Sequence, residues 1–115
     1  MTALDKDIEG VGCAALPAEE MAERAADAAA FLKALSHEGR LMILCHLSSG
    51  EKSVTELEDR LGARQAAVSQ QLARLRSEGL VAARRDGKAI YYSIKDPKAG
   101  AIMALVYDMF CNPAL

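Results

Sequence analysis

Aromatic residues are scarce in this chain of 115 residues, which has three tyrosines, two phenylalanines and no tryptophan. Hydrophobic residues nevertheless make up 51% of the sequence, so the core must be built from alanine, leucine, valine, isoleucine and methionine. Such a composition favours helices over a β-sandwich. A chain of this length can bury enough apolar surface for one compact domain. The composition therefore predicts a single, mainly helical domain.

Features of other protein classes are also missing. No run approaches the roughly 18 uncharged apolar residues of a membrane span, and the first ten residues, MTALDKDIEG, lack the basic and apolar regions of a signal peptide. We therefore expect a cytoplasmic protein that does not engage a membrane. The three cysteines, Cys13, Cys45 and Cys111, form no C-x-x-C motif. In a reducing compartment this spacing predicts free thiols rather than a disulfide framework.

The net charge is small, at −2, but the charges are segregated along the chain. Residues 1–35 hold seven acidic and three basic residues, whereas residues 64–88 hold six basic and two acidic residues. Because the local charge decides where a phosphate backbone can approach, the second segment is the candidate contact surface for nucleic acid.

Hydrophobic periodicity and capping signals predict five helices and two strands. We expect a flexible N-terminal arm over residues 1–17, a folded domain over 18–111 and a C-terminal tail over 112–115. Within the domain the helices are expected at Ala18–Leu35, Glu38–Leu47, Ser53–Leu61, Arg64–Glu78 and Pro97–Cys111, and the strands at Leu80–Arg85 and Ala89–Ile94.

The order of these elements, ααααββα, is typical of a winged helix-turn-helix fold, mainly α with a small β-hairpin. A tight Gly62-Ala63 turn joins two short helices, as in a helix-turn-helix unit. Asp86-Gly87 then separates the two strands, and this dipeptide readily adopts the positive φ angles of a hairpin turn. The hairpin would form the wing.

The Arg64–Glu78 helix has a narrow buried stripe and a slim polar face opposite it. Small side chains allow a helix to enter the major groove, and the amide of Gln70 can pair with an adenine edge. The basic side chains of this helix and of the hairpin tip would contact phosphates and give affinity rather than sequence specificity. The predicted DNA-binding residues are Arg64, Gln65, Ser69, Gln70, Arg74, Arg84, Arg85 and Lys88.

Two segments carry a resemblance to a known family. The run ALSHEGRLMILCHL, followed by AVSQQLARLRSEGLVAARRDGKAIYYSI, resembles the ArsR family of winged-helix repressors over residues 34–94. The resemblance implies a homodimer formed through the first and last helices, an operator DNA bound in its major groove by the helix-turn-helix, and an inducer that weakens this binding. It implies a transcriptional repressor rather than an enzyme, with no cofactor.

Many members of that family sense metals through paired cysteines on the third helix or through aspartate and histidine pairs on the last. Here the third helix has no cysteine, and the last has a lone Asp108 and no histidine, so neither four-ligand site can be assembled. His37 is expected to act as a cap or a packing residue, and His46 has only a weak claim to a function. We predict no metal site.

Cys45 on the second helix and Cys111 at the end of the last resemble the persulfide-sensing branch of the family, the SqrR-like and BigR-like repressors. The resemblance implies that reactive sulfur species link the two thiols through an intramolecular polysulfide bridge. That bridge would lower operator affinity and release genes of sulfide metabolism. Cys13 has no partner in this pattern.

Helix geometry provides a separate argument on Cys111. At 100° per residue, Cys111 lies about 180° from the stripe of Ile102, Val106 and Met109, so it would face away from a dimer seam formed by that stripe. A direct disulfide requires Cα atoms within about 7 Å, and each inserted sulfur adds about 2 Å. Thiols held slightly beyond disulfide reach would therefore select sulfane sulfur over other oxidants.

Three alternatives stay open from the residues alone. Cys45 can pack as a small apolar side chain, since free cysteine is often buried. The thiols can instead serve a sensor of oxidants or of soft metals and arsenite. A small sulfurtransferase or thiol oxidoreductase is the remaining possibility, although the sequence has no C-x-x-C motif and no identifiable set of cysteine, histidine and acid.

Overall fold

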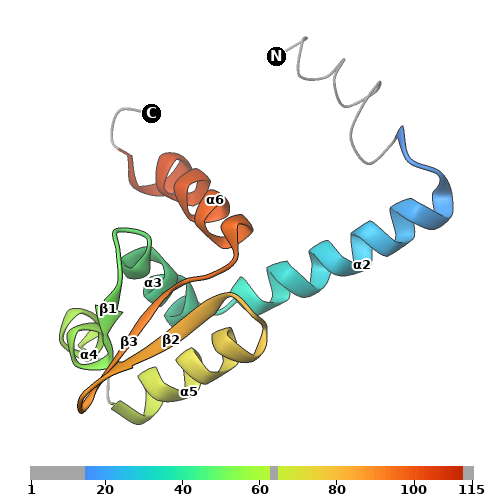
Figure 1. Ribbon diagram of the computed structural model, residues 1–115. Helices are drawn as coiled ribbons and strands as arrows, with labels where there is room; N and C mark the ends of the chain where they lie inside the picture. The colour runs from blue at the N-terminus through green and yellow to red at the C-terminus, as the bar shows by residue number, and fades with distance from the viewer. Residues whose placement is uncertain (1–14, 63–64, 113–115) are drawn as a thin grey trace. The chain divides into compact units, whose positions relative to one another are not determined.

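The computed structural model describes residues 15–62 and 65–112 (Figure 1). The chain divides into two units, residues 1–33 and 34–115, and most of the first long helix belongs to the first unit. The described elements are α2 (Ala18–Leu35), α3 (Glu38–Leu47), β1 (Lys52–Ser53), α4 (Val54–Leu61), α5 (Gln65–Ser77), β2 (Val81–Asp86), β3 (Ala89–Ile94), α6 (Pro97–Val106) and the π-helix η2 (Tyr107–Cys111).

The core of the second unit is organised around α3. This helix packs against α4, α5, α6 and β3, which explains why apolar residues occur on nearly all of its sides. The predicted stripe of α5 is confirmed, because Val68, Leu72 and Leu75 are at most 1% exposed. The other buried apolar side chains of the unit include Ile43, Leu44, Leu47, Leu57, Leu80, Val81, Ala99 and Met103.

The hairpin is part of a three-stranded antiparallel sheet in the order β1-β3-β2. The sequence predicted only β2 and β3, since β1 has two residues and so shows no alternation of its own. Lys52 pairs with Tyr92 and Ser53 with Tyr91, while Arg84 of β2 lies opposite Tyr91 on the other side. This third strand ties the base of the wing to the segment between α3 and α4.

Two predicted chain reversals are confirmed by backbone geometry. Gly79 ends the α5 segment with φ at +76°, and the amide of Leu80 then donates to the carbonyl of Leu75 at 3.0 Å. Gly87 has φ at +64° in the hairpin turn. Both angles lie in the left-handed region that glycine adopts without strain.

The last helix differs from the single α-helix that periodicity predicts. α6 begins at Pro97, capped by Asp96, and ends at Val106, after which η2 continues with wider turns. The amide of Asn112 donates to the carbonyl of Tyr107 at 2.9 Å, a bond across five residues. Because a π-turn holds more residues than an α-turn, each residue advances by less than 100°. The position predicted for Cys111 assumed 100° per residue, and this segment does not follow that rotation.

Much of the apolar surface of the last helix remains uncovered in a single chain. Ala99 and Met103 face the core and are buried, whereas Leu105, Met109 and Phe110 are 51%, 63% and 79% exposed. Monomeric proteins seldom leave a contiguous apolar stripe in water. The uncovered stripe is therefore a candidate surface for association with another chain.

α2 has an uncovered apolar stripe of its own. Its first turn carries Glu19 and Glu20, where the helix dipole favours acidic side chains. Met21 and Leu32 are 40% and 53% exposed, and only the last two residues of the helix are buried. None of the described helices is long and apolar enough to cross a membrane.

Candidate nucleic-acid interface and thiol pocket

The two helices α4 and α5 form the predicted helix-turn-helix unit. α4 begins at a capping box, in which the side chain of Ser53 accepts from the amide of Glu56 and the Glu56 carboxylate accepts from the amide of Ser53. On α5 the side chains of Ser69 and Gln70 are exposed, as predicted for a face that reads DNA. The predicted contacts Arg64 and the Gln65 side chain lie outside the described part of the chain.

Gln71 has a structural position that the sequence did not indicate. It is half-buried, unlike the exposed Gln70 beside it. A Cβ atom at Gly39 of α3 would meet the Gln71 side chain, so the two helices approach closely at this point. Gly39 therefore permits the packing of α5 on α3, and Gln71 faces α3 rather than solvent.

The wing borders α5 through a small pocket of about 300 Å³. Its lining includes Thr55 of α4, Ser69 of α5, and Lys88 and Tyr91 of the wing, and the hairpin tip lies on the side of α5 where that helix begins (Figure 1). Arg85 and Lys88 are exposed, and within the described residues neither forms an ion pair. Both side chains are therefore available to phosphates.

Arg84 has specific protein partners in the structure. Its Nε donates to Glu51 Oε2 at 3.1 Å, its Nη2 donates to Glu51 Oε1 at 2.6 Å, and its guanidinium lies 4.8 Å from the centre of the Tyr91 ring. Asp86 is a more distant partner at 3.8 Å. The hydrogen bonds from Arg84 lower the pKa of Glu51, and those same bonds raise the pKa of Arg84. Nothing in the sequence marked Glu51, which lies 33 residues before its partner.

Arg74 is held only loosely. Its Nε lies 3.3 Å from Glu78 Oε1, and both side chains are well exposed. An exposed pair of this kind typically contributes about 1 kcal/mol or less to the stability of the fold. The pair therefore leaves Arg74 available for a phosphate contact at small cost.

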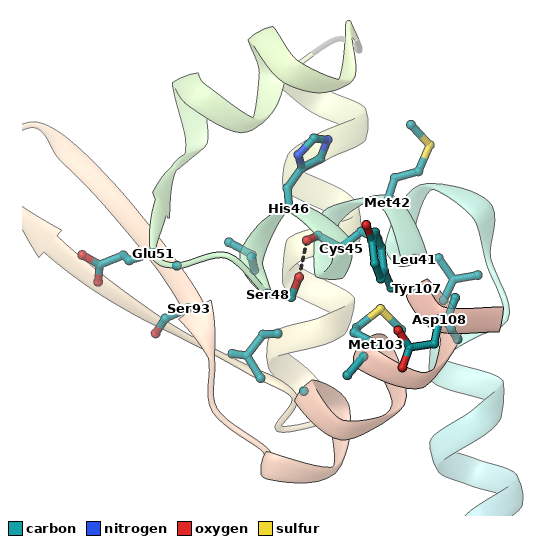
Figure 2. Close-up of a pocket in the computed structure, with 16 residues that line it drawn as sticks. Leu41, Met42, Cys45, His46, Ser48, Glu51, Ser93, Met103, Tyr107 and Asp108 are labelled. Carbon is teal, nitrogen blue, oxygen red and sulfur yellow. Dashed lines mark hydrogen bonds between the residues drawn. The ribbon is translucent and has the colours of Figure 1, made fainter. Parts of the chain in front are cut away.

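Cys45 lies at the surface, where it lines a large pocket between α3, β3 and the last helix. The pocket has a volume of about 1040 Å³, and Figure 2 shows Met42, Cys45 and His46 of α3 with Met103, Tyr107 and Asp108 from α6 and η2. Cys45 is exposed, so the alternative of a buried packing residue does not apply. The carbonyl of Cys45 accepts a hydrogen bond from Ser48 Oγ at 2.6 Å.

Cys111 is a free, exposed thiol at the end of η2. It is not among the residues lining the pocket, although Tyr107 and Asp108 of the same π-helix are. Cys111 follows Tyr107 by about one helical turn. The pocket is therefore lined on one side by Cys45 and on another by the helical turn that precedes Cys111. Cys13 lies outside the described residues.

The two histidines have different surroundings. His37 is the N-cap of α3, where its Nδ1 accepts from the amide of Gly39 at 3.1 Å, as the sequence predicted. His46 lines the thiol pocket. Over residues 15–62 and 65–112, no three side chains of histidine, cysteine, aspartate or glutamate are grouped so that they could hold a metal ion.

Comparison with known proteins places these features in a family. A model of the bacterial regulatory proteins of the arsR family matches residues 37–83, from the cap of α3 into β2. The biofilm growth-associated repressor of Agrobacterium fabrum is 44% identical over 97% of this chain and 93% of its own. The chain belongs to the ArsR family.

Solved structures of transcriptional regulators also share its fold. Reduced HlyU from Vibrio cholerae superposes with a TM-score of 0.79 at 39% identity, covering 82% of this chain and 99% of its own. The repressor BigR from Xylella fastidiosa superposes with a TM-score of 0.77 at 43% identity, covering 84% and 99%. The predicted winged-helix fold is thereby confirmed, and the likeness to BigR-type regulators is supported.

Proposed function

We propose that the protein is a transcriptional repressor that binds operator DNA through α5 and the wing. The observation that carries this proposal is the slim exposed face of α5, with Ser69 and Gln70, beside a wing tip that presents Arg85 and Lys88. Gln70 would read a base edge, and Arg64, Gln65 and Arg74 would contribute further DNA contacts. Two of the three relatives described above are named repressors, whereas HlyU of Vibrio cholerae is named a transcriptional activator.

The acting species is proposed to be a homodimer formed through α2 and α6. The exposed apolar residues of both helices support this assembly, since a second copy would remove them from water. A symmetric dimer places its two recognition helices about one turn of DNA apart, roughly 34 Å.

We further infer that reactive sulfur is the inducer and that Cys45 and Cys111 receive it. The exposure of both thiols supports this role, because a buried thiol would be protected from a donor. The pocket at Cys45 provides access for a donor and borders the turn that leads to Cys111. The matched HlyU structure is that of the reduced protein.

The proposed bridge requires no oxidant other than the sulfur donor. A persulfide R–S–SH transfers its outer sulfur to the Cys45 thiolate, forming Cys45–S–SH and leaving R–SH, and Cys111 reacts in the same way. The terminal sulfur of the Cys111 persulfide then attacks Sγ of the Cys45 persulfide. A trisulfide forms and H₂S leaves, which balances both atoms and electrons.

The DNA-binding proposal is tested by selecting operator sequences with the reduced protein and measuring affinity as a function of salt. Affinity for a selected site should fall steeply with salt, as expected for phosphate contacts. Transcription from a template carrying that site should decrease when the protein is added. Absence of specific binding at low salt would refute the proposal, and increased transcription would replace repression by activation.

The sulfur proposal is tested by mass spectrometry after separate treatment with polysulfide, peroxide and arsenite. We expect only polysulfide to link Cys45 to Cys111 with at least one inserted sulfur and to release DNA. Cys45→Ser and Cys111→Ser should bind DNA but no longer respond, while the matched variant Cys13→Ser should respond normally. A direct disulfide after peroxide would indicate an oxidant sensor, and arsenite release of DNA would indicate a soft-metal sensor.

A further inference from the structure

The wing is anchored at its base by an ion pair that reaches back to the end of α3. Glu51 lies between α3 and β1, and its carboxylate receives two hydrogen bonds from Arg84 of β2. A bidentate arginine–carboxylate contact fixes both distance and orientation, which a single contact does not. Tyr91 of β3 supports the other side of the guanidinium at 4.8 Å.

Several local hydrogen bonds hold the turn that lies between Cys45 and this anchor. Ser48 Oγ donates to the Cys45 carbonyl, and Ser49 Oγ donates to the His46 carbonyl at 2.9 Å. The ammonium of Lys52, whose side chain is buried, donates to Ser49 Oγ at 3.2 Å and to the Gly50 carbonyl at 3.1 Å. The segment between α3 and β1 is therefore held at both ends.

Glu51 belongs to both ends of this connection. It lines the pocket that contains Cys45, and it also binds the guanidinium at the base of the wing. A displacement of the α3 terminus on bridging would therefore move the carboxylate that holds Arg84. Packed elements and polar contacts of this kind are the physical means by which one site affects another.

We propose that Arg84 and Glu51 are positioning residues that set the orientation of the wing and couple it to the Cys45 pocket, while Arg85 and Lys88 make the phosphate contacts at the wing. The coupling half of this proposal rests on the proposed thiol switch; the positioning half does not. The side chains of Arg84 and Glu51 are 53% and 35% exposed, so solvent screens the contact enough for it to break when the α3 terminus moves.

The first test compares Arg84→Gln with the matched variant Arg85→Gln of the neighbouring position. Operator affinity of the reduced protein is measured between 50 and 200 mM salt. Loss of a phosphate contact in both protomers lowers the slope of log K against log salt by about 1.8. We expect this loss for Arg85→Gln. For Arg84→Gln we expect an unchanged slope and an affinity lowered about 2- to 30-fold, the size of two exposed pairs, one in each protomer.

The second test uses Glu51→Gln, alone and combined with Arg84→Gln. Removal of a carboxylate near DNA would strengthen binding if only long-range charge mattered, whereas loss of an anchor weakens it. We expect Glu51→Gln to weaken binding about as much as Arg84→Gln, and the double variant to be no weaker than either. Arg84→Lys should fail to restore affinity, because lysine cannot form the bidentate contact.

The coupling is read as the ratio of operator affinities before and after polysulfide treatment. This ratio should fall toward one in Glu51→Gln while mass spectrometry still detects the bridge. A slope lowered equally in both arginine variants, tighter binding by Glu51→Gln, or full rescue by Arg84→Lys would overturn the positioning role. An unchanged ratio in Glu51→Gln would overturn the coupling. If the unsubstituted protein shows no response at all, the thiol switch itself fails, and the salt slopes still decide the positioning role.

Discussion

Truncation of Leu105 to alanine measures whether a second copy covers the exposed stripe of α6. Leu105 is 51% exposed in a single chain, so about half of its side chain is still available for burial. Full burial of a leucine is worth about 1.5–3 kcal/mol, which leaves about 0.8–1.5 kcal/mol for each copy. In a symmetric dimer both copies lose this contribution, so the dimer dissociation constant should rise about 10- to 150-fold.

The measurement is sedimentation equilibrium of the reduced protein over a range of concentrations. Met42→Ala is the matched control, because Met42 is 43% exposed but lies on α3 rather than on the proposed seam. Alanine is the best helix former at both positions, so helix propensity does not weaken either variant. We expect Met42→Ala to leave dimerisation nearly unchanged. An unaltered dissociation constant for Leu105→Ala, or an equal loss for both variants, would refute dimerisation through this stripe.

Further predictions concern the recognition helix, the wing turn and its anchor. Gln70→Ala should weaken operator binding by about 1–3 kcal/mol per half-site and relax specificity at one base pair. Because Gln71 faces α3, Gln71→Ala should instead lower the melting temperature more than it alters specificity. An equal loss of specificity in the two variants would contradict this assignment. Gly87→Ala meets no atom within 4 Å but retains φ at +64°, so strain of about 1–2 kcal/mol should lower the melting temperature by several degrees; an unchanged melting curve would contradict it. Arg84→Gln should return the pKa of Glu51 toward its ordinary value of 4.5 in an NMR titration. In the unsubstituted protein, the stability that this ion pair contributes should be present above pH 4.5 and should be lost as the pH falls through the lowered pKa of Glu51. If the pKa of Glu51 does not change in Arg84→Gln, then Arg84 is not what lowers it.

Local signals were sufficient for most elements of the fold. The stripe of Val68, Leu72 and Leu75 fixed the buried side of α5, and the glycines at 79 and 87 gave the turns because only a few backbone conformations fit there. The cap at His37 also followed from its position before a helix. Each of these features depends on residues within a few positions of one another.

Features that depend on distant partners were not visible in the sequence. β1 is too short to show periodicity and exists because Lys52 and Ser53 pair with β3. The contact of Glu51 with Arg84 joins segments 33 residues apart. The site residues were therefore identified as exposed candidates. Only the structure distinguished Arg84, which has a fixed partner, from Arg85, which forms no ion pair with any of the residues that the structure describes.

The π-helix at the end of α6 makes residue count a determinant of where its thiol lies. Across Tyr107–Cys111 the backbone holds more residues per turn than an α-helix does. Deletion of one residue upstream of Cys111 with the π winding unchanged would turn the thiol by somewhat less than 100°, whereas a deletion that also restored α-helical winding would largely cancel that turn. In the proposed sulfur bridge, the number of residues before Cys111 would therefore affect the length of the sulfur chain that reaches Cys45.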